Sequence, residues 1–142
     1  MTALRKFDRT PDQPPRPWLQ EDAPRHALFH LRMAALNCRA AARLDLFRAC
    51  QMLSLDRDAA ATATAEALVR TLGQALHRAP RFYRPGSADI SFDESWLVSL
   101  IGALQRGDDM SATFLLHSRV SPEARRSVGF LAAKLAGGLH SV

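Results

Sequence analysis

Long apolar runs, cysteines, lysines and aromatic side chains are all scarce in this 142-residue sequence. No apolar stretch approaches the ~18 residues that a membrane-spanning helix needs, so we expect no membrane span. The only cysteines are Cys38 and Cys50, and on the helix predicted below they would lie about 18 Å apart, too far for a disulfide. Free thiols suit a reducing compartment, and residues 1–18 lack the apolar core of a secretory signal. The sequence therefore predicts a cytoplasmic location.

Motifs for catalysis, cofactors and metals are also missing. There is no glycine-rich phosphate loop and no GxSxG elbow. His26 and His30 would share a helix face, but no third ligand lies near them, so no metal site is predicted. The carboxylate pairs Asp93–Glu94 and Asp108–Asp109 stand at predicted helix starts, where the helix macrodipole favours negative charge. The sequence thus predicts no catalytic residue, no cofactor and no metal.

Helical periodicity dominates what is present. The sequence is 47% hydrophobic and 23% charged, which suits one globular domain, and no segment shows strand alternation. Residues 1–21 are rich in proline and are predicted to form a flexible arm. Residues 22–142 are predicted to form a single all-α domain, a bundle of about five helices.

The longest predicted helix runs from about residue 24 to residue 54, with Pro24 in its first turn. One apolar stripe along it consists of Leu28, Leu31, Ala35, Cys38, Ala42, Leu46, Ala49 and Leu53. A second apolar stripe, on another side of the helix, consists of Phe29, Met33, Leu36, Ala40, Leu44 and Phe47. A helix that is apolar on two sides is either central in its domain or shared across a dimer interface. We therefore expect this helix to organise the bundle.

Start and stop signals define the next two helices. Ser54 or Asp56 caps a helix predicted over residues 57–78. Ser91 and Glu94 form a capping box for the helix that follows, and Gly107 provides its left-handed stop.

Two shorter signals define the C-terminal helices. Residues 109–119 are predicted to form a short helix with Met110 and Phe114 facing inward and His117 as a further inward candidate. The run Ser121–Pro122–Glu123 combines a cap, a first-turn proline and a first-turn carboxylate, so it starts the last helix. That helix is predicted to close at Gly137–Gly138.

The positive charge of the chain comes almost entirely from arginine. The formal net charge is +5 and the pI about 10.2, but only Lys6 and Lys134 are lysines. The charge is spread over both halves of the chain without a basic block, which weakens the case for nucleic acid. An arginine- and alanine-rich composition is typical of a GC-rich bacterial genome. Together with the segment WLVSLIGALQRGDD (residues 96–109), it is similar to that of small bacterial helical proteins.

Two sets of side chains are candidates for binding a protein partner. The first is the cationic and aromatic cluster Arg78, Arg81, Phe82, Tyr83 and Arg84. The second is an arginine stripe on the long helix, with Arg32, Arg39 and Arg43. Arginine forks bind carboxylates and aromatic rings anchor partners. The alternative is that the two rings fill a gap between helices while the arginine stems lie along the edge of the bundle.

A helix, a short turn and a second helix over residues 109–136 allow a different hypothesis. In a helix-turn-helix, the start of the second helix reads the major groove of DNA. Arg119, Ser121, Arg125 and Arg126 would then contact nucleic acid. Two helices joined by a short turn are equally the ordinary unit of any helical bundle.

The first functional hypothesis is a non-catalytic bacterial regulatory or adaptor protein that acts through protein–protein interaction. Its partner is a protein of unknown identity or a second copy of the chain. The second hypothesis is a helical DNA-binding regulator that uses residues 109–136. A small helical enzyme is the third and least favoured.

Overall fold

The computed structural model describes residues 21–40 and 50–139. Its helices are α1 (Asp22–Ala40), α3 (Arg57–Ala75), α4 (Phe92–Gln105), α5 (Asp109–Arg119) and α6 (Pro122–Leu139). No strand occurs within those two ranges, so the all-α class is confirmed. Residues 1–20 of the predicted arm lie outside the described residues. So do residues 41–49, across which the long helix was expected to continue.

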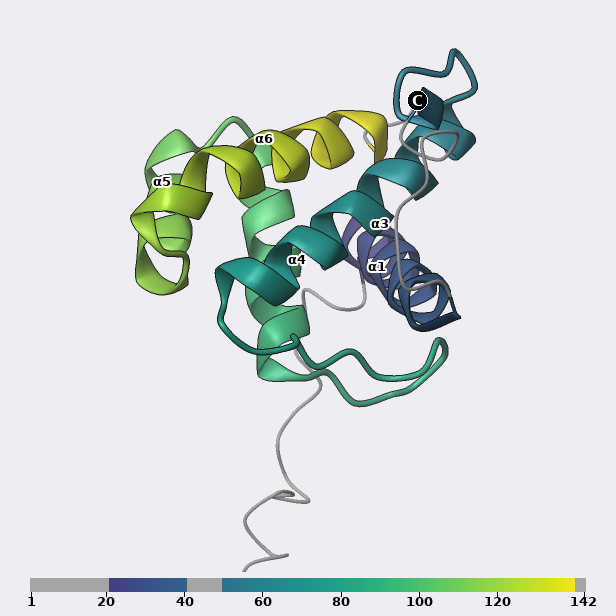
Figure 1. Ribbon diagram of the computed structural model, residues 1–142, viewed down its shortest axis with the longest axis horizontal. Helices are drawn as coiled ribbons and strands as arrows, with labels where there is room; N and C mark the ends of the chain where they lie inside the picture. Colours follow the sequence, from purple (N-terminus) through teal and green to yellow (C-terminus); the bar gives the residue numbers. More distant parts are fainter. Residues whose placement is uncertain (1–20, 41–49, 140–142) are drawn as a thin grey trace, which may run out of the picture.

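The helices α1, α3, α4 and α6 surround one hydrophobic core. Helix α6 runs across α3 and α4, while α1 packs on α3 and α4 from another side (Figure 1). Helix α5 lies beside α4 at the edge of the molecule, far from α1 (Figure 1). The large apolar side chains that are completely buried in this core are Leu31, Leu68, Leu72, Leu97, Leu100, Ile101, Val120, Val128 and Leu135.

The predicted caps of α3 and α4 are confirmed. The Asp56 side chain accepts hydrogen bonds from the first backbone N–H groups of α3. Ser91 and Glu94 form the reciprocal capping box at the start of α4. After α4 ends, Gly107 adopts a φ of +70°, which glycine reaches without the steric cost of a Cβ.

The observed ends of α3 and α6 lie a few residues from their predicted positions. Helix α3 stops at Ala75 rather than at residue 78, because His77 takes a left-handed φ of 58°. Helix α6 does not close at Gly137–Gly138 but continues to Leu139, which is buried. A Cβ built at Gly138 would lie 3.8 Å from the Cβ of Ala61 in α3, so close packing between the two helices carries α6 past its glycines.

The predicted inward face of α5 is also wrong. Met110 and Phe114 are 86% and 72% exposed, His117 is exposed as well, and Ala112 is the one buried residue of this helix. Residues 110 and 114 lie on the side of the helix opposite Ala112, since successive residues are turned by about 100°. The small Ala112 therefore allows α5 to approach the core closely, with Leu115 and Leu116 packed half-buried against it, while Met110 and Phe114 face outward.

Helix α1 buries the first of its two apolar stripes. Leu28, Leu31 and Ala35 are buried in the core. Of the second stripe, Phe29, Met33 and Leu36 are 52%, 36% and 38% exposed. Within the described part of the chain, α1 is therefore covered on one side and leaves an apolar stripe on its outer side.

Candidate protein-binding surface

The loop that joins α3 to α4, residues 76–91, is held in place by a buried carboxylate. Glu94, in the first turn of α4, is completely buried. Its oxygens accept hydrogen bonds from Nε and Nη2 of Arg32, at 2.7 and 3.2 Å. They also accept from the backbone N–H groups of Tyr83 and Ser91, at 3.0 and 2.9 Å. One carboxylate thus caps α4, fixes the loop and pairs with α1.

Arg32 supplies the α1 side of this contact. Besides the pair with Glu94, its guanidinium donates to the carbonyl oxygens of Ser87 and Asp89, at 3.1 and 2.7 Å. The side chain is buried, and a fork that donates in two directions fixes the loop relative to the helix. Arg32 is a predicted partner-binding residue, but these donors are engaged inside the chain. The structure shows Arg32 in the role of positioning the loop.

A second carboxylate, Asp93, connects the loop to α5. Its Oδ2 accepts from the backbone N–H of Arg81 at 2.8 Å. Its Oδ1 lies 2.6 Å from Nη2 of Arg119 and 3.3 Å from Nη2 of Arg78. Burial alone would raise the pKa of this carboxyl, but the hydrogen bond from Arg81 and the two guanidiniums together hold the pKa below its usual value.

The Arg119 side chain is largely enclosed by its neighbours rather than exposed to solvent. Its guanidinium carbon lies 5.0 Å from the ring centre of Phe92 and 5.1 Å from that of Trp96. The side chain is 15% exposed and is paired with Asp93. Stacking on two rings and a salt bridge fix α5 to the start of α4. The guanidinium that the DNA hypothesis assigns to a phosphate is therefore enclosed within the chain and paired with Asp93 through Nη2.

The predicted cationic and aromatic cluster divides into buried and exposed members. Phe82 is buried in the core, so one predicted anchor fills a gap between helices. Its carbonyl oxygen accepts from Nη2 of Arg39 at 3.2 Å, which gives the loop a second attachment to α1. Arg81 and Arg84 are exposed, and the Arg81 guanidinium lies 5.8 Å from the ring centre of the half-buried Tyr83. Arg43 lies outside the described residues.

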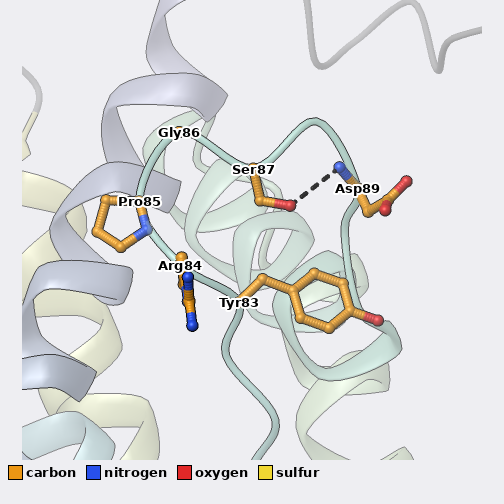
Figure 2. Close-up of a pocket in the computed structure, with 6 residues that line it drawn as sticks. All are labelled: Tyr83, Arg84, Pro85, Gly86, Ser87 and Asp89. Atoms are coloured by element: carbon orange, nitrogen blue, oxygen red, sulfur yellow. Dashed lines mark hydrogen bonds between the residues drawn. The ribbon is translucent and has the colours of Figure 1, made fainter.

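The loop encloses a shallow hollow whose wall is formed by Tyr83, Arg84, Pro85, Gly86, Ser87 and Asp89. Figure 2 shows Pro85 beside α1, with the Tyr83 ring and the Asp89 carboxylate on the other side of the hollow. Gly86 turns the chain with a φ of +85°, and Ser87 Oγ accepts from the Asp89 backbone N–H. The hollow is open and its lining is about equally polar and apolar, which suits a contact region better than an enclosed ligand site.

The outer stripe of α1 and the loop are neighbours. Arg32 and Arg39 bond to the loop on one side of α1, and Phe29, Met33 and Leu36 follow the adjacent outer side. We use the name α1–loop surface for Phe29, Met33, Leu36, Arg39, Arg81 and Arg84. It combines an apolar strip on α1 with Arg39, which bonds to the loop, and with the exposed Arg81 and Arg84 of the loop itself.

The other residues predicted to contact nucleic acid lie at the junction of α5 and α6. Arg125 donates from Nε to the carbonyl oxygen of Val120 at 2.9 Å, within the junction itself. The carbonyl oxygen of Ser121 accepts the backbone N–H of Arg125 in the first turn of α6. Arg126 is exposed, and it is the member of this set whose guanidinium is most accessible.

His26 and His30 lie together on α1, as their spacing predicts. Their rings meet edge to face, with centres 4.6 Å apart. Burial lowers the pKa of His30, the neighbouring His26 lowers it further, and Asp58 partly offsets both. Among the residues that the structure describes, no group of three or more His, Cys, Asp and Glu side chains could hold a metal ion.

The sequence interpretation missed the main role of Asp93 and Glu94. It explained them as first-turn charges of α4, and the capping part is correct. The available signal was their position directly after a loop rich in arginine, since buried carboxylates need cationic partners. The choice of Arg32 as the partner of Glu94 joins positions 62 residues apart and depends on how α1 packs.

Comparison of the chain with protein-family models, curated proteins and solved structures found no match. Within the described ranges, none of the helices combines the length and apolar character that crossing a membrane requires.

Proposed function

We propose that this protein is a non-catalytic adaptor or regulatory module that binds another protein through the α1–loop surface. One observation carries the proposal, namely that Phe29, Met33 and Leu36 form a continuous exposed apolar stripe along α1. Their spacing of four and three residues keeps them on one side of the helix. Contiguous exposed apolar residues with a polar rim are typical of protein-interaction sites.

The fixed loop beside the stripe supports the proposal. A surface that is already ordered loses less conformational entropy on binding than a mobile one. Glu94 and Arg32 hold the loop through buried hydrogen bonds, so Arg81 and Arg84 are presented from a fixed backbone. Arginine at the rim of an apolar strip is well suited to bind carboxylates of a partner.

The charges of this surface favour a different protein over a second copy. In an antiparallel α1 pair with Phe29 against Leu36 of the second copy, Arg25 would face the region of Arg39. Like charges would then meet across the interface, whereas an acidic amphipathic segment would match both the stripe and its cationic edge. We therefore propose an acidic partner for this surface. The cytoplasmic location of this protein stays a prediction from the sequence.

The proposal is tested with Met33→Asp, which places a charge in the middle of the stripe at a side chain that the core does not need. Leu55→Asp is the matched control, because Leu55 is fully exposed and lies outside the α1–loop surface. Cross-linked partners are captured from cells that express each variant. We expect a partner that is retained by the wild type and by Leu55→Asp and lost with Met33→Asp. Identical partner sets for all three proteins would contradict the proposal.

The DNA-binding hypothesis has less support. Arg119 is paired with Asp93, so the exposed cation left in the predicted set is Arg126, with Arg125 partly covered. If DNA is bound through phosphate contacts, affinity falls by orders of magnitude between about 50 and 200 mM salt. The double substitution Arg125→Ala/Arg126→Ala would then abolish binding in a fluorescence anisotropy titration with duplex DNA.

A further inference from the structure

Helix α5 presents a second apolar surface, distinct from the α1–loop surface. Met110 and Phe114 are exposed one helical turn apart, and His117 continues the same side of the helix. This side points away from the core, toward which Ala112 and the enclosed Arg119 face. In Figure 1, α5 lies at the outer edge of the molecule, on the far side from α1.

The pattern on this side of α5 is complementary to itself when two copies run antiparallel. With the two-fold axis outside the Met110–Phe114 side of the helix, at the level of residue 112 along its length, Met110 of one copy lies opposite Phe114 of the second copy, and the reverse. A thioether against an aromatic ring is a favourable contact. Interfaces with two-fold symmetry require this reciprocity, in which residue i meets residue j and j meets i.

The polar side chains at the ends of α5 fit the same arrangement, because an imidazole N–H can donate to a carboxylate. Asp109 at the N-terminus is exposed, and His117 near the C-terminus is exposed on the adjoining side. In the antiparallel pair, His117 lies within about 3 Å, along the helix axis, of the level of Asp109 in the second copy. Opposite ends of the two helix macrodipoles also face each other. The outer stripe of α1 lacks this complementarity, because arginines of the two copies would face each other across the interface.

We propose that the protein forms a homodimer through antiparallel pairing of α5, with the Met110–Phe114 contact at its centre. The occupant of this surface is a second copy, and the α1–loop surface stays open on both subunits. A contact limited to one short helix and its surroundings is small, so the dimer is in exchange with the monomer at micromolar concentration. The proposal is independent of the proposed function, since the two surfaces share no residue.

The first experiment measures the oligomeric state of the full chain by sedimentation equilibrium over a range of concentrations. The variants are Phe114→Asp on α5 and Met33→Asp on α1. We expect a monomer–dimer equilibrium for the wild type and for Met33→Asp, and a dissociation constant at least tenfold higher for Phe114→Asp. A wild type that is monomeric up to hundreds of micromolar would overturn the proposal. So would a dimer that Met33→Asp dissociates and Phe114→Asp does not.

A second experiment tests the register without removing an apolar side chain. Thr113 is exposed and lies close to the proposed two-fold axis, whereas Ser118 is exposed at the end of the helix, away from the axis. In a Cys50→Ser background, which removes the exposed native thiol, Thr113→Cys should form a disulfide-linked dimer under mild oxidation. Ser118→Cys should not. Equal cross-linking of both variants, or of neither, would overturn the antiparallel α5 pair.

Discussion

The loop of residues 76–91 and helix α5 differ in how they are attached to the rest of the fold, and the irregular loop is attached by more buried polar contacts than the regular helix. The loop contains no helix or strand, yet Glu94, Arg32 and Arg39 attach it to α4 and α1 through buried or half-buried hydrogen bonds. Helix α5 is regular, yet Ala112 is its one buried residue, and the Arg119 ion pair and the Trp96 indole hydrogen bond to the Leu115 carbonyl attach it to α4. The number of buried polar attachments in these two regions therefore does not follow backbone regularity. This difference in attachment separates the two proposed surfaces, since one includes a fixed loop and the other lies on a peripheral helix.

The largest effect is expected when the α1 attachment of the loop is removed. Arg32→Met leaves the Glu94 carboxylate buried without its cation, so the free energy of unfolding should fall by about 3–5 kcal/mol. Urea unfolding followed by circular dichroism measures the change. The double variant Arg32→Met/Glu94→Leu removes both charges and should recover part of the loss. A single variant within about 1 kcal/mol of the wild type would show that this pair does not hold the loop.

A smaller fall in the free energy of unfolding is expected when α5 loses its ion pair. Arg119→Met keeps an apolar stem between Phe92 and Trp96 but removes the hydrogen bond to Asp93, which should cost about 1–3 kcal/mol. Arg126→Met removes an exposed arginine nearby and should stay within about 0.5 kcal/mol. Thermal and urea unfolding compare the three proteins. Equal stability of the two variants would mean that the enclosure of Arg119 does not stabilise α5.

The dependence of stability on pH tests the role of the Asp93 charge. Its folded-state pKa is lowered, so the unfolded chain binds the proton more readily. The stability that Asp93 supplies is therefore present at neutral pH and is lost as the pH falls below about 4, through its folded pKa. Asp93→Asn should be less stable than the wild type at pH 7, and the two should converge toward pH 2. A difference that is constant over this range would contradict the role given to the Asp93 charge.

The smallest effect on stability is expected on the outer side of α5. Met110 makes little contact with the core, so Met110→Ser should change the free energy of unfolding by less than about 0.5 kcal/mol. Ala112→Ser is the comparison on the inner side, where the hydroxyl would be buried. Both variants are measured at a concentration at which the chain is monomeric. A fall in the free energy of unfolding of more than about 1 kcal/mol for Met110→Ser would show that this side is packed.

The sequence predicts local features of this fold well and distant pairings poorly. The caps at Asp56 and Ser91 and the stop at Gly107 were identified because each depends on a few neighbouring residues. The inward side of α5 was predicted incorrectly because large apolar residues were assumed to face the core. The structure uses the small Ala112 there and leaves Met110 and Phe114 outside.

The candidate site shows the same limit. The cluster at residues 78–84 and the arginines of α1 were both identified, but as separate groups. Their contact through Glu94 joins residues 32 and 94, and such a pairing has no signature in the spacing of a single sequence. The division of the cluster into a buried Phe82 and exposed Arg81 and Arg84 likewise depends on how α1 and α4 pack.

Hydrogen exchange of the backbone amides is the most direct test of the central claim that α1 locks this loop into a preformed binding surface. The Tyr83 N–H donates to the buried Glu94, whereas Ala88 in the same loop is exposed. We predict that Tyr83 exchanges at a rate close to that of core amides in α4, that Ala88 exchanges far faster, and that Arg32→Met removes the protection of Tyr83 while the α4 core stays protected. Exchange of Tyr83 as fast as that of Ala88 in the wild type would contradict the account.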